Sequence, residues 1–176
     1  MLAQRWRRCV HRGHRNRLEV RMTKQADFTP EEWTQVLEGP TSAGLLVITA
    51  SRGGTFRETF SMGKAYAEAR QRHGQSELLD AIVADKPKTD RTRYHSPEEL
   101  KDHALRHIRD AVALLQAKAT PQELEDYRGF VVGLAERVAA AHSEHGEEVS
   151  EGERAAIGEI DGALGSGGEP ASGAAG

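Results

Sequence analysis

The stretch Thr41–Ser51, TSAGLLVITAS, decides how this chain folds, because it contains the longest apolar run in the sequence. Its centre, Leu45–Thr49, has the composition of a β-strand. No second run of this kind exists to pair with it, and a lone buried strand would leave its backbone amides and carbonyls without partners. A helix satisfies these groups internally. We therefore interpret the stretch as a buried, central helix that ends at Gly53–Gly54.

Four capping boxes, one before this stretch and three after it, predict the starts of further helices. In such a box the side chain of a Ser or Thr just before the helix accepts a hydrogen bond from the backbone amide three residues later. The Glu or Gln at that later position in turn accepts one from the backbone amide of the Ser or Thr. Three of the four also carry proline at the first helical position, where its missing amide costs nothing. The boxes are TPEE from Thr29, SPEE from Ser96, TPQE from Thr120 and SEGE from Ser150.

The remaining apolar residues recur at spacings of three and four, which is typical of helices that face a core. We expect a first helix over Pro30–Glu38 that ends at Gly39–Pro40, with Phe28 packing back on Trp33. The sequence thus predicts an all-α fold, a compact antiparallel bundle of about six to seven helices. Further helices are expected over 55–73, from Ser76, from Ser96, from Thr120 (an antiparallel neighbour of the one before it) and over 151–164. The expected core contains Trp33, Leu46, Phe56, Phe60, Ile108, Leu115, Phe130 or Val131, Leu134 and Ile160.

The two ends of the chain differ from this helical domain, which we place at residues 22–164. Residues 1–21 hold seven of the 24 basic residues and one of the 27 acidic ones, so without them the net charge changes from −3 to −9. Leu18, Glu19 and Val20 can be encoded by a bacterial ribosome-binding sequence just ahead of the Met22 codon. We therefore expect translation to start at Met22. At the other end, residues 165–176 are rich in Gly, Ser and Ala, and we expect them to be disordered.

Two alternatives for function remain open at this stage. If the basic leader is present, its arginines would neutralise phosphates and give salt-sensitive binding of nucleic acid. Separately, His103 and His107 stand four apart on one predicted helix, a spacing that can bind zinc. His142 and His145 would supply a second pair. As partly buried or helix-end imidazoles, all four histidines also have a purely structural interpretation.

The other features exclude several classes of protein. One cysteine, Cys9, cannot form an internal disulfide framework or a cysteine-based zinc cluster. No segment approaches the roughly 20 apolar residues of a membrane span, and neither a nucleophile elbow nor a phosphate-binding loop is present. We expect a non-enzymatic, cytoplasmic interaction or structural protein without a cofactor. Its partner would be another protein or a second copy, the latter bound through the apolar Thr41–Ser51 helix.

Two motifs carry a family resemblance. FTPEEW at Phe28–Trp33 and VSEGERAAIGEI at Val149–Ile160 resemble the start and end of a group of uncharacterised bacterial proteins. The second motif is also similar to the closing helix of the TerB-type helical domains of tellurite resistance. The resemblance implies a small helical domain and, for the TerB-type likeness, a stress-response role. No functional residues are carried over.

Overall fold

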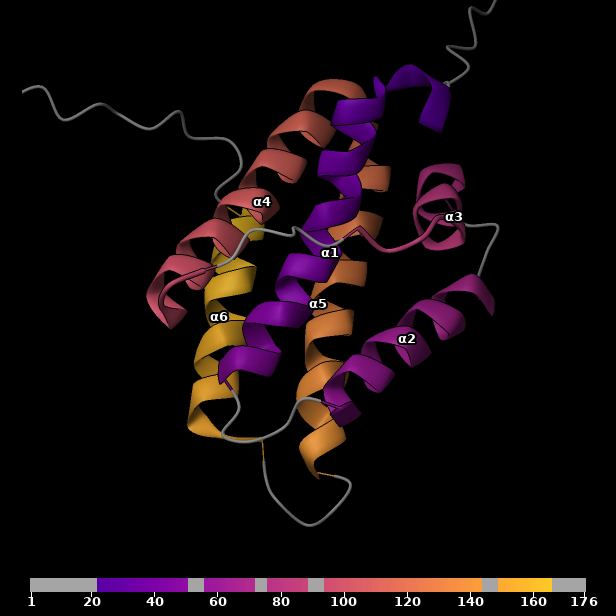
Figure 1. Ribbon diagram of the computed structural model, residues 1–176. Helices are drawn as coiled ribbons and strands as arrows, with labels where there is room; N and C mark the ends of the chain where they lie inside the picture. The colour runs from indigo at the N-terminus through magenta and orange to yellow at the C-terminus, as the bar shows by residue number, and fades with distance from the viewer. Residues whose placement is uncertain (1–21, 51–55, 72–75, 89–93, 144–148, 166–176) are drawn as a thin grey trace, which may run out of the picture.

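The computed structural model describes residues 22–50, 56–71, 76–88, 94–143 and 149–165, except for the side chains of 56–61 and 142–143. These residues form helices and no strand, which confirms the all-α prediction (Figure 1). The predicted leader, 1–21, and all of the predicted tail beyond Gly165 lie outside the described residues. No described helix combines the length and the apolar character needed to cross a membrane. The elements are η1 (Gln25–Asp27), α1 (Pro30–Ala50), α2 (Phe56–Gln71), α3 (Glu77–Ala84), α4 (Pro97–Lys118), α5 (Pro121–Ser143) and α6 (Glu151–Gly165).

The middle of the bundle is α1, which contacts α2, α4, α5 and α6 (Figure 1). The helices α4 and α5 run in opposite directions, but each packs more extensively on α1 than on the other. The prediction of a buried central helix is confirmed for Thr41–Ala50, in which most side chains are buried. Because this burial occurs inside the bundle, the stretch offers little surface to a second copy of the chain.

The predicted helix end at Gly39–Pro40 is wrong, because α1 continues through both residues. Proline has no amide hydrogen, so the carbonyl of Val36, four residues earlier, lacks its helical donor. The hydroxyl of Tyr127, on α5, donates to this carbonyl at 3.0 Å. Gly39 leaves the room for it, since a Cβ at this position would overlap the Tyr127 hydroxyl. The two predicted helices are therefore one, and the described residues contain six α-helices rather than seven.

The core largely matches the expectation. The predicted residues Trp33, Leu46, Ile108, Leu115, Val131, Leu134 and Ile160 are all buried. Phe130 is only partly buried, and its ring meets that of Tyr66 edge-on with centroids 5.3 Å apart. Phe28 packs on Trp33 as predicted, at 5.6 Å between ring centroids. The side chains of Phe56 and Phe60 lie outside the described part of the chain.

The capping boxes explain why the helices begin where they do. At the start of α1 the Thr29 amide donates to the Glu32 carboxylate at 2.7 Å, and the Glu32 amide donates to the Thr29 hydroxyl at 3.2 Å. The same reciprocal pairs open α5 and α6. At α4 the Ser96 hydroxyl accepts from the Glu99 amide, while the Glu99 carboxylate accepts from the amide of His95, the residue before the cap. All four predicted helix starts are confirmed.

Candidate functional site

The predicted histidine pair lies on α4 with the two imidazoles near each other. The ring centroids of His103 and His107 are 6.4 Å apart, edge to face. His107 Nδ1 shares a hydrogen bond of 3.1 Å with the Ser42 hydroxyl on α1, and the Tyr94 ring lies 5.3 Å from that of His103. Both rings thus have structural neighbours from other segments.

A structural zinc ion needs four ligands and a catalytic one needs three from the protein. Within the described residues, no three or more His, Cys, Asp or Glu side chains come together in a way that could hold a metal ion. His103 and His107 therefore supply two ligands at most from this part of the chain. The alternative pair falls on His142 and His145, which lie outside the described side chains. Metal binding by these histidines stays a prediction.

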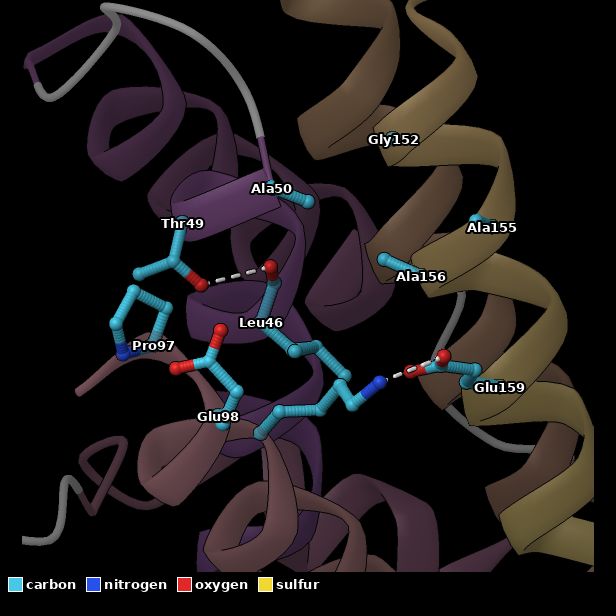
Figure 2. Close-up of a pocket in the computed structure, with 10 residues that line it drawn as sticks. Leu46, Thr49, Ala50, Pro97, Glu98, Gly152, Ala155, Ala156 and Glu159 are labelled. Atoms are coloured by element: carbon cyan, nitrogen blue, oxygen red, sulfur yellow. Dashed lines mark hydrogen bonds and ion pairs between the residues drawn. The ribbon is translucent and has the colours of Figure 1, made fainter.

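The structure adds a candidate site that the sequence did not reveal, a groove of about 250 Å³ between the C-terminal end of α1 and the N-terminal parts of α4 and α6 (Figure 2). We call it the α1/α4/α6 groove. Its apolar surface comes from alanines, a proline and one leucine, and four of its ten lining residues carry a polar or charged side chain. The lining residues are Leu46, Thr49, Ala50, Pro97, Glu98, Lys101, Gly152, Ala155, Ala156 and Glu159.

An ion pair joins the two walls of the groove. Lys101 Nζ on α4 lies 3.0 Å from Glu159 Oε1 on α6, and both side chains remain partly exposed. The hydrogen bond to Glu159 raises the pKa of Lys101 above its ordinary value. Glu98 adds a second carboxylate on the α4 side (Figure 2). The groove thus has charged groups of both signs beside an apolar surface.

The close approach of α6 to the end of α1 depends on a glycine. A Cβ on Gly152 would lie 2.9 Å from the backbone oxygen of Ala50, a distance that real side chains do not adopt. Gly152 therefore lets the two backbones meet at one end of the groove. Any larger residue would push α6 outward and change the shape of the groove.

The chemistry of the lining suits binding better than catalysis. The only hydroxyl among the lining residues, on Thr49, donates to carbonyls of its own helix at 3.0 and 2.9 Å. The only amine, on Lys101, is protonated and paired with Glu159. Neither group is poised as a nucleophile next to a general base. The lining can hold an apolar group and contact polar groups beside it.

Comparisons with protein-family models, with curated proteins and with solved structures found no match. The function is therefore argued from the groove and its surroundings. Sequence reasoning missed the groove because its charged pair is 58 residues apart. The one sequence signal near it is that two capping boxes, at Ser96 and Ser150, open the helices that form two of its walls.

Proposed function

We propose that this chain is a non-enzymatic binding module that receives an apolar side chain of a protein partner in the α1/α4/α6 groove. The observation that carries the proposal is the combination of an apolar lining with the Lys101–Glu159 pair that joins two walls of the groove. Specific protein interfaces likewise combine apolar contacts with polar and charged ones. The proposal places the protein in the cytoplasm, where a chain with a single cysteine needs no disulfide.

The size of the groove favours a peptide side chain over a free small molecule. Pockets for drug-sized ligands are typically about 300–1,000 Å³, and the groove, at about 250 Å³, falls below this range. One or two side chains of a partner fit such a volume. The charged lining residues would then fix the orientation of the partner rather than supply most of the affinity.

The test is selection of a random peptide library, displayed on phage, against the purified protein and two variants. Ala155→Arg places a long side chain at an exposed position of the groove. Ala113→Arg, on an exposed position of α4 about four turns beyond Glu98, is the matched control. We expect selected peptides to share an apolar anchor, to bind Ala113→Arg normally and to bind Ala155→Arg at least tenfold more weakly.

Two results would overturn the proposal. Peptides that bind both variants equally would show that the groove is not the binding surface. Peptides without a shared apolar residue would contradict the role given to the lining. Light scattering on the same proteins checks the alternative occupant, since a dimer dissociated only by Ala155→Arg would identify a second copy of the chain.

A further inference from the structure

A buried carboxylate near the start of the described chain lacks a cationic partner. Glu123, in the first turn of α5, is only 2% exposed, and Thr23, which contacts it, is 4% exposed. The Thr23 backbone nitrogen donates to Glu123 Oε1 at 2.8 Å, and the Thr23 hydroxyl donates to Oε2 at 2.8 Å. The Thr120 amide and hydroxyl, at 2.9 Å each, complete the set. All four donors are neutral groups.

Burial removes the hydration of this charge, and the four neutral donors take its place. Burial tends to raise the pKa of Glu123, but the hydrogen bonds from Thr120 and Thr23 outweigh it, so the pKa is lowered and the carboxyl is ionised at neutral pH. In the described part of the chain no Lys, Arg or His forms an ion pair with it. The positive end of the α5 dipole supplies only a partial charge.

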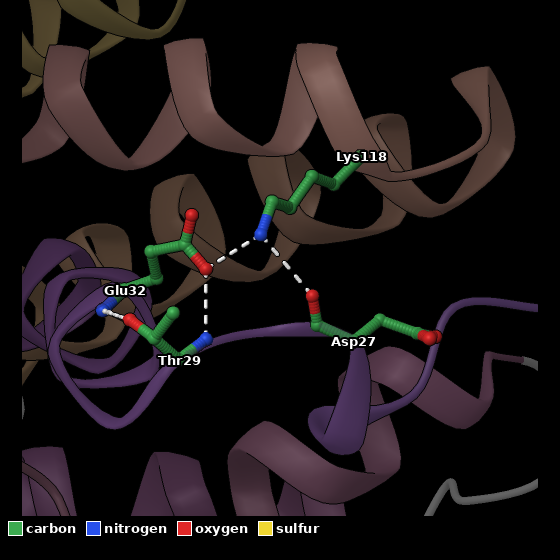
Figure 3. Close-up of polar contacts among 4 residues, drawn as sticks. All are labelled: Asp27, Thr29, Glu32 and Lys118. Atoms are coloured by element: carbon green, nitrogen blue, oxygen red, sulfur yellow. Dashed lines mark hydrogen bonds and ion pairs between the residues drawn. The ribbon is translucent and has the colours of Figure 1, made fainter.

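Lys118 lies close to this site, since its backbone carbonyl is 3.3 Å from the Thr23 hydroxyl. Its ammonium group is directed elsewhere, to the Glu32 carboxylate and, at 3.1 Å, to the carbonyl of Asp27 (Figure 3). It also lies 5.3 Å from the centre of the Phe28 ring. Lys118 is therefore not a counter-charge for Glu123.

The group nearest to Glu123 Oε1 is the nitrogen of Thr23, and the residue before it is a methionine. The side chain of Met22 is 38% exposed, the one exposed large apolar side chain of the described residues. The inference rests on the predicted translation start at Met22: cells remove an initiator methionine when the next residue is small, and threonine, at position 23, belongs to that class. Hydrolysis of the Met22–Thr23 peptide bond by water releases free methionine and leaves an α-amine on Thr23, which takes up a proton at neutral pH.

We propose that Met22–Thr23 is a processing site, and that the resulting α-ammonium of Thr23 forms a buried ion pair with Glu123. The amide already lies within hydrogen-bonding distance of the carboxylate, so the ammonium needs no rearrangement of α5 to reach it. Removal of Met22 converts the neutral amide of Thr23 into a charged ammonium group at the same nitrogen atom. The hydrogen bond to the ionised carboxylate is already charge-assisted, and the ammonium adds a full positive charge to it, so that an ion pair fastens the beginning of the folded domain to α5.

The first experiment identifies the natural amino terminus. The gene, with its own upstream sequence and a tag only at the C-terminus, is expressed in bacteria, and the purified protein is analysed by intact mass and N-terminal sequencing. We expect Thr23 as the first residue of most molecules. A protein that begins mainly at Met1 or retains Met22 would overturn the proposal.

The second experiment measures the ion pair. A cleavable fusion yields one chain that begins at Thr23 and a control with a single alanine before it, which moves the charge outward by about 3.8 Å yet keeps the Thr23 amide. We expect urea unfolding to give an unfolding constant about tenfold smaller for the Thr23 chain, equivalent to about 1.4 kcal/mol. Glu123→Gln in both chains should abolish the difference. Equal stability of the two parent chains would refute the ion pair.

If the Glu123→Gln chains do not fold, the reactivity of the α-amine gives an independent answer. A buried, paired ammonium should be acylated by an N-hydroxysuccinimide ester at least tenfold more slowly in the folded Thr23 chain than in the alanine-extended control. In denaturant the two chains should react alike. Equal rates in the folded state would overturn the proposal.

Discussion

The Tyr127 hydroxyl explains why α1 continues through Pro40, and removing it tests this explanation. In Tyr127→Phe the carbonyl of Val36 loses its donor, because the residue at position 40 has no amide hydrogen to replace it. The carbonyl is then buried without a partner, since Val36 is fully buried. Leaving such a group unsatisfied costs about 1–3 kcal/mol. For a domain of this size each kcal/mol lowers the melting temperature by about 2–4 °C.

The assay is urea and thermal unfolding, followed by far-UV circular dichroism, of four proteins in a double-mutant cycle. Pro40→Ala restores an amide at position 40, which can donate to the Val36 carbonyl. Tyr127→Phe should therefore cost about 1–3 kcal/mol in the wild-type background and markedly less in the Pro40→Ala background. Equal costs in both backgrounds would refute the explanation of the continuous helix.

A second cycle tests the space beside the hydroxyl. Gly39→Ala should be strongly destabilising in the wild-type protein, because the added Cβ overlaps the Tyr127 hydroxyl. Without that hydroxyl the nearest atoms are Ala111 Cβ at 3.3 Å and the Tyr127 Cζ position at 3.4 Å, which is tight but tolerable. Tyr127→Phe should therefore rescue most of the loss caused by Gly39→Ala. A Gly39→Ala protein as stable as the wild type would contradict this packing.

Three further predictions concern hydrogen bonds in other parts of the bundle. The Trp33 indole donates to the Asp85 carboxylate at 2.8 Å and lowers the pKa of Asp85. This hydrogen bond therefore stabilises the folded protein above the unfolded-state pKa of Asp, about 3.9, and its contribution is lost as the pH falls through the lower pKa of the folded state. Trp33→Phe should raise the pKa of Asp85 in a carboxyl NMR titration, and an unchanged pKa would contradict the assignment. Ser76→Ala removes the cap of α3 and should cost about 1 kcal/mol in urea unfolding, so an unaltered midpoint would show that the cap is dispensable. Glu159→Gln should lower the pKa of Lys101, measured by side-chain NMR, and a constant value would mean that the pair across the groove does not persist in solution.

The starts of the helices were predictable because each depends on neighbours in the sequence. A capping box places a hydroxyl and a carboxylate within one turn of each other, so Ser96, Thr120 and Ser150 can be recognised without knowledge of the rest of the fold. The buried character of Thr41–Ala50 was predictable for a similar reason, because a run of apolar residues with no β partner has to be helical and covered.

The continuation of α1 through Gly39–Pro40 was not predictable, since its cause lies elsewhere in the chain. The hydroxyl that replaces the missing amide belongs to Tyr127, 91 residues after the carbonyl it binds. Local rules correctly treat glycine followed by proline as a helix end when no such donor is available. The α1/α4/α6 groove escaped prediction for the same reason, because three helices from different parts of the sequence form it.

The position of α1 in the middle of the bundle affects how the chain is made. The ribosome releases α1 before the helices that cover it, and about 115 residues separate Ala50 from the end of α6. At 5–20 residues per second the apolar side of α1 waits roughly 6–23 s for its last partner. A messenger that ends before the Glu151 codon would leave the part of α1 that faces α6 uncovered, so the shortened product should be less stable and more prone to aggregate.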